Sequence, residues 1–556
     1  RMHAFETIAR IRDTTQLLLD LHEVDRSLYL HPLKVWERYS PTMFLPHRWK
    51  DGALLPLSDS VEAARLFTHL SPWRPDAAAQ RLDAWDRLFQ EAVTAHGALP
   101  SDHPERRRLA GRLLDLLVGR EDRIRSLCDR YFQLPDLLSI LGREIGTGRI
   151  GGKAVGMLLG RRIVGSALPD EDMESHDSFF IGADVFYTYL VHNGCWDLRM
   201  RQKAPDGYFR LAGDLKERIL SGSFPEAVRE RFRLMLEHYG QSPIIVRSSS
   251  LLEDDFGNAF AGKYESVFCV NQGSPARRLE QFEQAVRTVY GSMMDEDALT
   301  YRLRRGLSGR DEQMALLVQR VSGRRRTRWF FPDLAGVAQS RNLYVWDPRL
   351  VPEAGMVRLV LGLGTRSVDR VEGDYPAMVA LDNPTLRTAS VSEDPRRYSQ
   401  HFVDAMDLEE NRFVTLPLEE VAAILDGDEL DLLATRDRDA EVRRAELRLP
   451  PVPQWMLTFR KLRAESDFAS RIQAWLGALE AAYEYPVDVE FTANRSAAGR
   501  YVDERTVYDI LKQEGMPAIA AHTNSLIARI GAVDQFLNRQ VDGGAGFLID
   551  PGCLQL

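Results

Sequence analysis

The stretch GREIGTGRIGGKAVGMLLG, residues 142–160, places a glycine-rich segment and one lysine ahead of an apolar run. Gly146, Gly148 and Gly151 have the spacing G-x-G-x-x-G, and Lys153 follows a pair of glycines. Such a segment has four interpretations: a dinucleotide fingerprint, a phosphate-binding P-loop, the glycine loop of a protein kinase, or a flexible helix entry with a solvated lysine.

The residues around this segment argue against the first three interpretations. A dinucleotide fold needs a strand directly before the glycines and an acidic strand end about 20 residues later. Here the preceding LPDLLSILGREI has leucines at helical spacing, and no such acidic strand end follows. A P-loop needs glycine and serine or threonine where this chain has Thr147 and Ala154. The HRD signature of kinases does not occur in the sequence.

The composition is that of a globular protein with room for roughly three or four domains of ~150 residues. Of the 556 residues, 44% are apolar and 28% are charged. The net charge of −9 argues against nucleic-acid binding, which requires a basic surface. No apolar run reaches the ~20 residues of a membrane span, so we expect no membrane partner. The four cysteines contain no CxxC pair, which favours a cytoplasmic location. Because the chain begins at Arg1, we expect a fragment or a processed chain.

The pattern along the chain predicts four parts. Residues 1–140 are expected to form a helical N-terminal domain, because FETIARIRDTTQLLLDLHEV and RLAGRLLDLLVGREDRIRSLCDRYF repeat apolar residues at three- and four-residue spacing. Residues 141–305 mix helices with the strands SFFIGADVF and PIIVRSSS. Residues 306–500 are richer in strands and contain an acidic helical insert, most simply a solvated face. Residues 501–556 are predicted to be a helical C-terminal tail.

A second motif, IIVRSSSLLEDDFGNAFAGKYESVF, runs from Ile244 to Phe268. A β-branched strand delivers Arg247 at its end, three serines follow, and a segment with Gly262 comes after an acidic turn. Arginine offers a planar fork of donors and loop N–H groups form an anion nest, so the motif is a plausible polyphosphate cradle. Taken alone, the motif also fits a simpler interpretation, a strand–loop–strand unit whose arginine lies on the surface.

Together the two stretches resemble the nucleotide-binding domain of the pyruvate phosphate dikinase and phosphoenolpyruvate synthase family. The segment GGKAVG matches the first family motif, and Val246 to Gly262 match the V-R-S-S-x-x-x-E-D and F-A-G motifs with the same spacing. LLVQRV, AGVAQSRN, LGLG and VDVEFT then follow in the order of the family. The resemblance covers roughly residues 140–495 and implies an α+β fold of the ATP-grasp type, in which two lobes clamp ATP.

The resemblance also implies roles for individual residues. Lys153 matches the lysine that binds nucleotide phosphates, and Arg247 matches the arginine over them. Glu490 matches the metal-binding glutamate, which makes Lys153, Arg247 and Glu490 the expected catalytic residues. The further residues expected around the nucleotide are Gly262 and Ser266 on a loop over the phosphates, and Gln319, Arg320 and Val321 beside adenine.

The strand YPVDVEFTAN supports a magnesium site through its alternation. Val487, Val489, Phe491 and Ala493 fall on one face, and Asp488, Glu490, Thr492 and Asn494 fall on the other, because side chains alternate along a strand. Carboxylate and amide oxygens next to phosphates are the ligands that Mg²⁺ prefers. The expected metal ligands are Glu490, Asn494 and, further along the chain, Asp503. The alternative is a polar strand face that only meets water.

Three features depart from the family. The L-Q-[TS]-R-P segment is replaced by GRYVDERTV, in which Asp503 and Arg505 keep only the spacing. Thr365 stands where the family has the glutamate of its G-L-G-E segment. The phosphohistidine carrier signature is absent, and His522 has no glycine pair or serine before it, so a helix-surface histidine is the simpler interpretation.

A run of arginines in SGRRRTRWF is predicted to be a solvated hairpin tip, with a docking point for an acidic or phosphorylated ligand as the alternative. The sequence as a whole predicts an ATP- and Mg²⁺-dependent phosphotransferase module. Its partner is expected to be a phosphohistidine carrier domain or another acceptor protein. A catalytically weak ATP sensor or scaffold and an ATP-grasp ligase remain alternatives.

Overall fold

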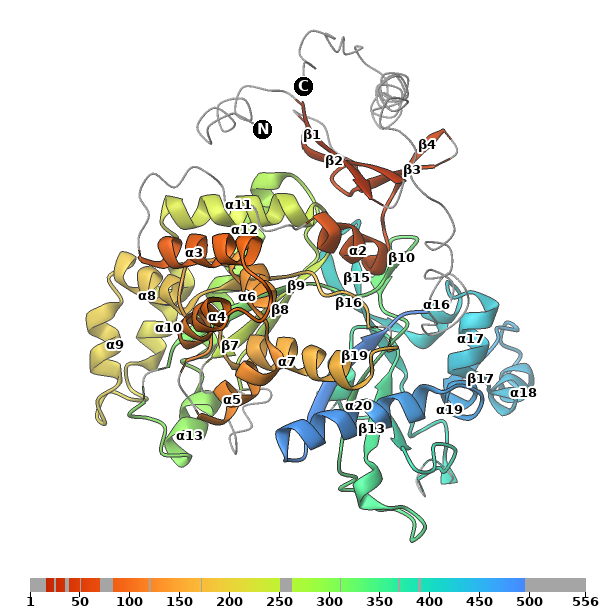
Figure 1. The fold of residues 1–556 in the computed structure, drawn as a ribbon. Helices are drawn as coiled ribbons and strands as arrows, with labels where there is room; N and C mark the ends of the chain where they lie inside the picture. Colours follow the sequence, from red (N-terminus) through yellow and green to blue (C-terminus); the bar gives the residue numbers. More distant parts are fainter. Residues whose placement is uncertain are drawn as a thin grey trace.

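The chain forms a mixed α+β structure (Figure 1), seen here in a computed structural model. The structure describes residues 17–24, 27–35, 40–50, 52–70, 84–119, 122–171, 173–250, 263–310, 312–368, 371–388, 391 and 393–495. The predicted C-terminal helical tail lies outside these residues. No helix in the described part of the chain combines the length and the apolar character that a membrane span requires.

From Leu17, where the structure first describes the chain, the N-terminal region forms an antiparallel sheet and not the predicted helix. Strands β1 (Leu17–Val24), β2 (Ser27–Val35), β3 (His47–Lys50) and β4 (Ala53–Pro56) are neighbours in that order. The sequence from Leu19 to His22 alternates leucine with a polar residue, which is the period of a strand. The pairing of β1 with β2 along its whole length therefore outweighs the helix propensity of leucine.

The described residues from Ser60 to residue 141 are largely helical, as predicted, but they do not form a separate core. Helices α2 (Ser60–Leu70), α3 (Ala84–Ala98), α4 (Pro104–Leu117), α5 (Asp122–Tyr131) and α6 (Leu134–Leu141) follow the sheet. Side chains of α3 to α6, such as Leu88 and Leu113, share one apolar cluster with Val155 and Leu159 of α7 (Gly152–Ala167). Residue 140 is therefore not a boundary between two cores.

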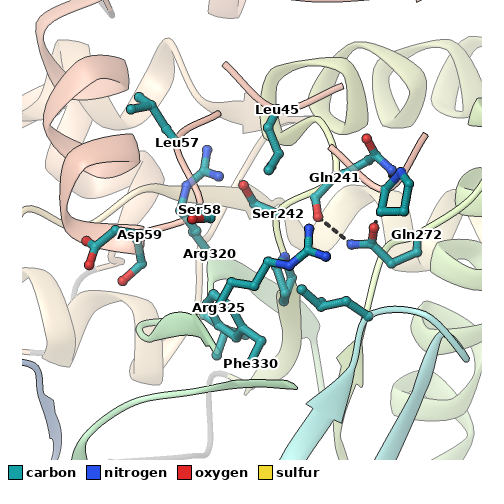
Figure 2. A pocket seen from close by; sticks show the side chains of 15 residues that line it. Leu45, Leu57, Ser58, Asp59, Gln241, Ser242, Gln272, Arg320, Arg325 and Phe330 are labelled. Carbon is teal, nitrogen blue, oxygen red and sulfur yellow. Dashed lines mark hydrogen bonds between the residues drawn. The ribbon is translucent and has the colours of Figure 1, made fainter. Parts of the chain in front are cut away.

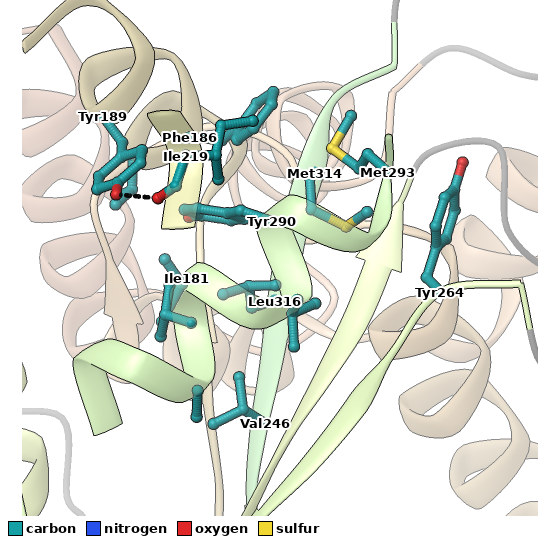
Figure 3. Packing of buried hydrophobic residues seen from close by; sticks show 14 of the residues in the cluster. Ile181, Phe186, Tyr189, Ile219, Val246, Tyr264, Tyr290, Met293, Met314 and Leu316 are labelled. Carbon is teal, nitrogen blue, oxygen red and sulfur yellow. Dashed lines mark hydrogen bonds between the residues drawn. The ribbon is translucent and has the colours of Figure 1, made fainter. Parts of the chain in front are cut away.

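A five-stranded sheet forms the centre of the first half of the molecule. Its order is β5 (Glu144–Ile145), β6 (Ser178–Ile181), β9 (Met314–Arg320), β7 (Ile244–Ser250) and β8 (Ser266–Cys269). The helices that contribute to the apolar cluster on one face include α8 (Ala183–His192), α10 (Ala212–Ser221), α11 (Glu226–Tyr239) and α12 (Pro275–Ser292). Figure 3 shows this packing around Tyr290 and Leu316.

Two smaller helices complete this half, α9 (Trp196–Gln202) and α13 (Glu296–Arg304). Helix α7 packs on the opposite face of the sheet, where Phe180 and Leu317 join the cluster of α3 to α7. Arg247 is the cross-strand partner of Leu317, so its side chain lies on the α7 face of the sheet.

The second half contains two four-stranded antiparallel sheets. One has the order β14 (Ala377–Ala380), β13 (Met356–Val360), β12 (Leu334–Gln339) and β19 (Asp488–Ala493), and we call it the β19 sheet. The other has the order β10 (Arg324–Arg326), β11 (Trp329–Phe331), β15 (Phe402–Asp407) and β16 (Arg412–Pro417). The short helices η1 (Pro352–Ala354) and α14 (Thr365–Val368) lie between strands.

The acidic insert is helical, as predicted, in α16 (Leu418–Ala422), α17 (Gly427–Leu433) and α18 (Arg438–Glu446). Its apolar residues Val421 and Leu433 are part of the core, so only its other side is solvated. Strands β17 (Ala434–Arg436) and β18 (Trp455–Leu457) pair beside it. Helices α19 (Arg460–Glu465) and α20 (Phe468–Tyr483) follow, and Leu479 of α20 joins the cluster of α3 to α7.

The hydroxyl of Ser249 fixes the start of α7 to strand β7. It accepts a hydrogen bond from the N–H of Ala154 (3.0 Å) and donates one to the carbonyl of Ile150 (2.8 Å). Gly151 has a φ of 82°, and a Cβ at this residue would lie 1.5 Å from the carbonyl oxygen of Ser249. Only glycine permits this close approach. The predicted glycine segment and the predicted VRSS motif are thus in direct contact.

We expect Ser249→Ala to lower the thermal unfolding midpoint and to speed hydrogen exchange in residues 150–155. The substitution leaves a buried N–H and a buried carbonyl without partners, which costs on the order of 1–3 kcal/mol. Ser221→Ala, at an exposed position of α10, is the matched control and should change neither measurement. If residues 150–155 of Ser249→Ala exchange hydrogen at the wild-type rate, the two hydrogen bonds of the Ser249 hydroxyl do not stabilise the start of α7.

His47 on β3 is fully buried, and burial lowers its pKa to about 4. In the unfolded chain the pKa of histidine is about 6.5, so below this pH the unfolded state binds a proton that the folded state does not. Stability contributed by neutral His47 is therefore lost as the pH falls from about 6.5 towards 4. We expect His47→Gln to flatten the dependence of the thermal midpoint on pH in this range. The exposed His192→Gln should not, and an identical slope in both variants would contradict the assignment.

Candidate functional site

The glycine segment leads directly into the first turn of α7. Gly146, Gly148 and Gly151 all have positive φ angles, of 84°, 99° and 82°. Gly151 is the N-cap of α7, and Lys153 is the second residue of the helix. This end of a helix favours anions, because its first N–H groups have no intrahelical partner. The helix start thus presents N–H groups and an ammonium group together.

Arg247 of β7 and Glu490 of β19 form an ion pair between the two halves of the molecule. The Arg247 side chain is 24% exposed and that of Glu490 is 48% exposed, so both remain in contact with solvent. The five-stranded sheet and the β19 sheet therefore meet through the two charged side chains that the motifs single out.

The charge of Glu490 is set by its surroundings. Burial alone would raise its pKa, but the Arg247 guanidinium, and to a lesser extent the ammonium of Lys153, lower the pKa below its ordinary value. The carboxylate is thus ionised at neutral pH. The influence of Lys153 shows that the start of α7 lies near this ion pair. Lys153, Arg247 and Glu490 are therefore brought together, as the sequence predicts, although they are far apart along the chain.

Ser266 is the first residue of β8 and lies directly opposite Arg247 in the ladder. It is exposed, so it is available to a ligand at the Arg247 end of the sheet. Gly262 and Asp503 lie outside the described residues, as do Arg505 and His522, and their predicted roles stay predictions.

Strand β9 connects the two halves and holds Gln319, Arg320 and Val321 at its end. The N–H of Arg320 donates to the carbonyl of Asp177 (3.0 Å), and the N–H of Val321 donates to that of Pro243 (2.9 Å). These two N–H groups are therefore engaged within the protein. The expected contact of this strand with adenine then depends on Gln319, whose amide lies 3.5 Å from the Ser178 hydroxyl.

A cavity beside Arg320 and Val321 is too small for a nucleotide (Figure 2). Its volume of about 20 Å³ has room for about one water molecule. The N-terminal region closes it with Leu45 and Leu57, and Gln241 and Gln272 hydrogen-bond to each other at its edge. This cavity is a packing gap under the N-terminal region and not the nucleotide site.

Asn494 follows β19 and is buried, unlike Glu490 on the strand itself. Its amide donates to Ser322 (2.7 Å) and to Glu174 (3.2 Å), and its oxygen accepts from the N–H of Asp333 (3.3 Å). An amide engaged in this way joins segments of the protein. Of the expected metal ligands in the described part of the chain, Glu490 is the one whose side chain is exposed, beside Arg247. No group of three or more potential metal-binding side chains occurs among the described residues.

The alternation predicted for the strand YPVDVEFTAN is confirmed for β19. Asp488, Glu490 and Thr492 are exposed, whereas Val489 and Phe491 are half-buried and pack against the core.

The arginine run forms the hairpin β10–β11, as predicted, but most of it is not solvated. The ion pairs are Arg324 and Arg326 with Asp333 and Glu429, and Arg328 with Asp407. These pairs hold the hairpin onto the second half of the molecule. These pairs were not predicted because Glu429 and Asp407 are distant in the chain, and because Asp333, only 7 to 9 positions away, lies beyond the next strand. Thr365 likewise has an internal role, since its hydroxyl donates to Asp404 (2.5 Å).

Two carboxylates near β9 were also not predicted, the buried Asp177 and the half-buried Glu174. Asp177 accepts hydrogen bonds from Arg320 (2.7 and 2.9 Å) and pairs with Arg143 and His238. Glu174 accepts from Ser60 (3.0 Å), and from Ser322 and Asn494. Acidic residues just before the strand SFFI are the only sequence signal for them. Their effect is to hold β9 and the segment after it in place.

Comparison with known proteins supports the motif assignment. The phosphoenolpyruvate synthase of Neisseria meningitidis serogroup B is 25% identical over 185 residues, which cover 31% of this chain and 22% of that protein. The similarity thus spans less than a quarter of the relative. The family model for the pyruvate phosphate dikinase AMP/ATP-binding domain matches residues 147–502, more than half of the chain. The chain therefore belongs to the pyruvate phosphate dikinase AMP/ATP-binding domain family.

Proposed function

We propose that this chain is an ATP-binding phosphotransferase module that activates Mg·ATP and passes a phosphoryl or pyrophosphoryl group to a histidine or another acceptor on a separate domain or chain. The observation that carries the proposal is the meeting of Arg247 and Glu490 across the two halves, beside Lys153. In this proposal the five-stranded sheet and the β19 sheet belong to the two lobes of an ATP-grasp fold, and the polyphosphate lies between them.

The charged groups suit this role. Arg247 and Lys153 offer charge-assisted hydrogen bonds to phosphate oxygens, and the N–H groups at the start of α7 add to them. Phosphoryl transfer needs mainly positioning and charge neutralisation, which these groups supply without a covalent step. In this proposal Gln319 lies beside adenine and Ser266 beside the phosphates, and Val321 has only its carbonyl and side chain for adenine, because its N–H is engaged.

A magnesium ion fits the donors in the cleft. Mg²⁺ is commonly held by one or two carboxylates together with phosphate oxygens and water, and Glu490 provides an ionised, half-exposed carboxylate. The ion would be held by Glu490, with Asp503 as a further predicted ligand, and would supply additional neutralisation of the phosphate charge. Asn494 is left out of this set because its amide is engaged elsewhere.

Two other functions are distinguished by their products. A catalytically weak sensor or scaffold would bind ATP without turning it over, and the replacement of the L-Q-[TS]-R-P segment favours it. An ATP-grasp ligase would release ADP, whereas dikinase chemistry releases AMP. The meeting of Arg247 and Glu490 beside Lys153 suits phosphoryl transfer, so we favour the phosphotransferase.

We expect Lys153→Ala and Arg247→Gln each to weaken binding of Mg·ATP at least tenfold, or ~1.4 kcal/mol, in isothermal titration calorimetry. Each change removes a charge-assisted phosphate contact. Glu490→Gln should lower the dependence of binding on Mg²⁺.

Two matched controls accompany these variants. Arg412→Gln removes an exposed arginine from β16, and Asp488→Asn removes a carboxylate two residues from Glu490 on the same strand face. Both should retain affinity close to that of the wild type. Unchanged affinity in Lys153→Ala and Arg247→Gln would mean that the site is elsewhere.

We expect the chain alone to show little net phosphotransfer from ATP labelled at the β or γ position. AMP formation should appear when a phosphohistidine carrier domain is added. Acid-labile, base-stable label on the chain that disappears in His522→Ala would instead identify a self-contained histidine-phosphorylating module. Slow release of ADP without any carrier would support the ligase.

A further inference from the structure

Strand register places a second arginine, Arg358, on the same face of the β19 sheet as Glu490. Val337 of β12 is the cross-strand partner of Arg358 on one side and of Glu490 on the other. Directly opposed residues of an antiparallel sheet point to the same face. Two strand spacings of about 4.8 Å separate the backbones of Arg358 and Glu490, or about 10 Å. The arginine and the carboxylate therefore flank Val337 on the face that meets Arg247.

The position of Arg358 is unusual for a charged side chain. Strand β13 lies inside the sheet, between β12 and β14, and its sequence is MVRLV. All residues of the strand except Arg358 are buried. Val357 and Leu359, on the opposite face, belong to the core. Because Arg358 points away from the face of Val357 and Leu359, its guanidinium takes no part in that core.

The guanidinium of Arg358 has no counter-ion within the described part of the chain. Its Nε atom is buried without a hydrogen-bond partner, and none of the described residues forms an ion pair or a hydrogen bond with the side chain. A buried polar group that lacks a partner needs an explanation, because desolvation without a hydrogen bond is costly. A ligand that brings acceptors to this face supplies one.

Several other arginines of the second half are paired, although Arg463 of α19 also has a buried Nε without a partner. Arg324, Arg326 and Arg328 are paired with carboxylates. Arg366, which follows β13, is paired with two aspartates. The contrast identifies Arg358 as an arginine whose position the fold itself does not use.

We propose that Arg358 is a second phosphate-binding residue of the cleft and contacts the terminal phosphates of a nucleoside triphosphate held between Arg247 and Glu490. This inference rests on the function proposed above and adds a residue to it. Arg247 would approach the polyphosphate from the five-stranded sheet, and Arg358 from the β19 sheet. A planar guanidinium donates two parallel hydrogen bonds to phosphate oxygens, which fixes their orientation as well as their charge. The site thereby gains a cation from the β19 sheet.

The experiment is calorimetric titration of the full chain with Mg·ATP, Mg·ADP and AMP, for the wild type, Arg358→Gln, Arg358→Lys and the control Arg412→Gln. We expect Arg358→Gln to weaken binding of ATP about tenfold and to leave that of AMP unchanged, because AMP lacks the terminal phosphates. The affinity of Arg358→Lys for ATP should lie between those of the wild type and Arg358→Gln, since lysine keeps the charge and loses the fork of donors. Arg412→Gln should match the wild type.

Thermal unfolding separates a binding role from a structural one. A guanidinium that stabilises the fold would lower the midpoint when it is removed, whereas Arg358→Gln should retain or raise it. If the glutamine variant does not fold, Arg358→Lys carries the comparison. Wild-type chain that fails to bind Mg·ATP would overturn the proposed function itself. If the wild type binds ATP but Arg358→Gln binds it equally tightly, only the role of Arg358 would be overturned. The same holds if Arg358→Gln loses the same factor of affinity for ATP and for AMP.

Discussion

The hydrogen bonds of the Ser249 hydroxyl determine how the candidate site is assembled. They hold the N–H of Ala154 and the carbonyl of Ile150, on either side of a glycine that tolerates no side chain. Because Ser249 lies two residues after Arg247 on the same strand, the start of α7 is fixed relative to that arginine. The first turn of α7, which carries Lys153, and Arg247 are therefore held in a fixed relative position. Preorganised charge is effective in phosphoryl transfer because little reorganisation is needed when the ligand binds.

A second constraint acts on the segment that connects the two halves. Glu174 accepts hydrogen bonds from Ser60, Ser322 and Asn494, which belong to the N-terminal region, to the segment after β9 and to the end of β19. Burial raises the pKa of Glu174, and these three donors oppose that rise. The N-terminal region is thus attached at the place where the two halves are joined.

Local patterns in the sequence predicted the parts of the site that depend on local structure. The glycine segment before α7, strand β7 and the alternation along β19 follow from glycine spacing, β-branched residues and a period of two. Strands β1 and β2 were not predicted, because their leucines also fit a helix and only the pairing of the two neighbouring strands settles the choice. The engagement of Asn494 with Glu174 depends on residues 320 positions apart, which no local pattern reveals. The importance of Arg358 has the same origin, since only strand register relates it to Glu490.

The ion pair between Arg247 and Glu490 indicates how the cleft would respond to a ligand. Both side chains are partly exposed, and such pairs contribute little to stability, at most about 1 kcal/mol. Opening the pair therefore costs little, and each partner then meets a stronger ligand: phosphate oxygens for Arg247 and a divalent cation for Glu490. A polyphosphate and its metal ion would replace one weak contact with two stronger ones. Binding of the nucleotide without the metal would leave Glu490 facing negative charge, so the affinity of this cleft for ATP should depend steeply on Mg²⁺.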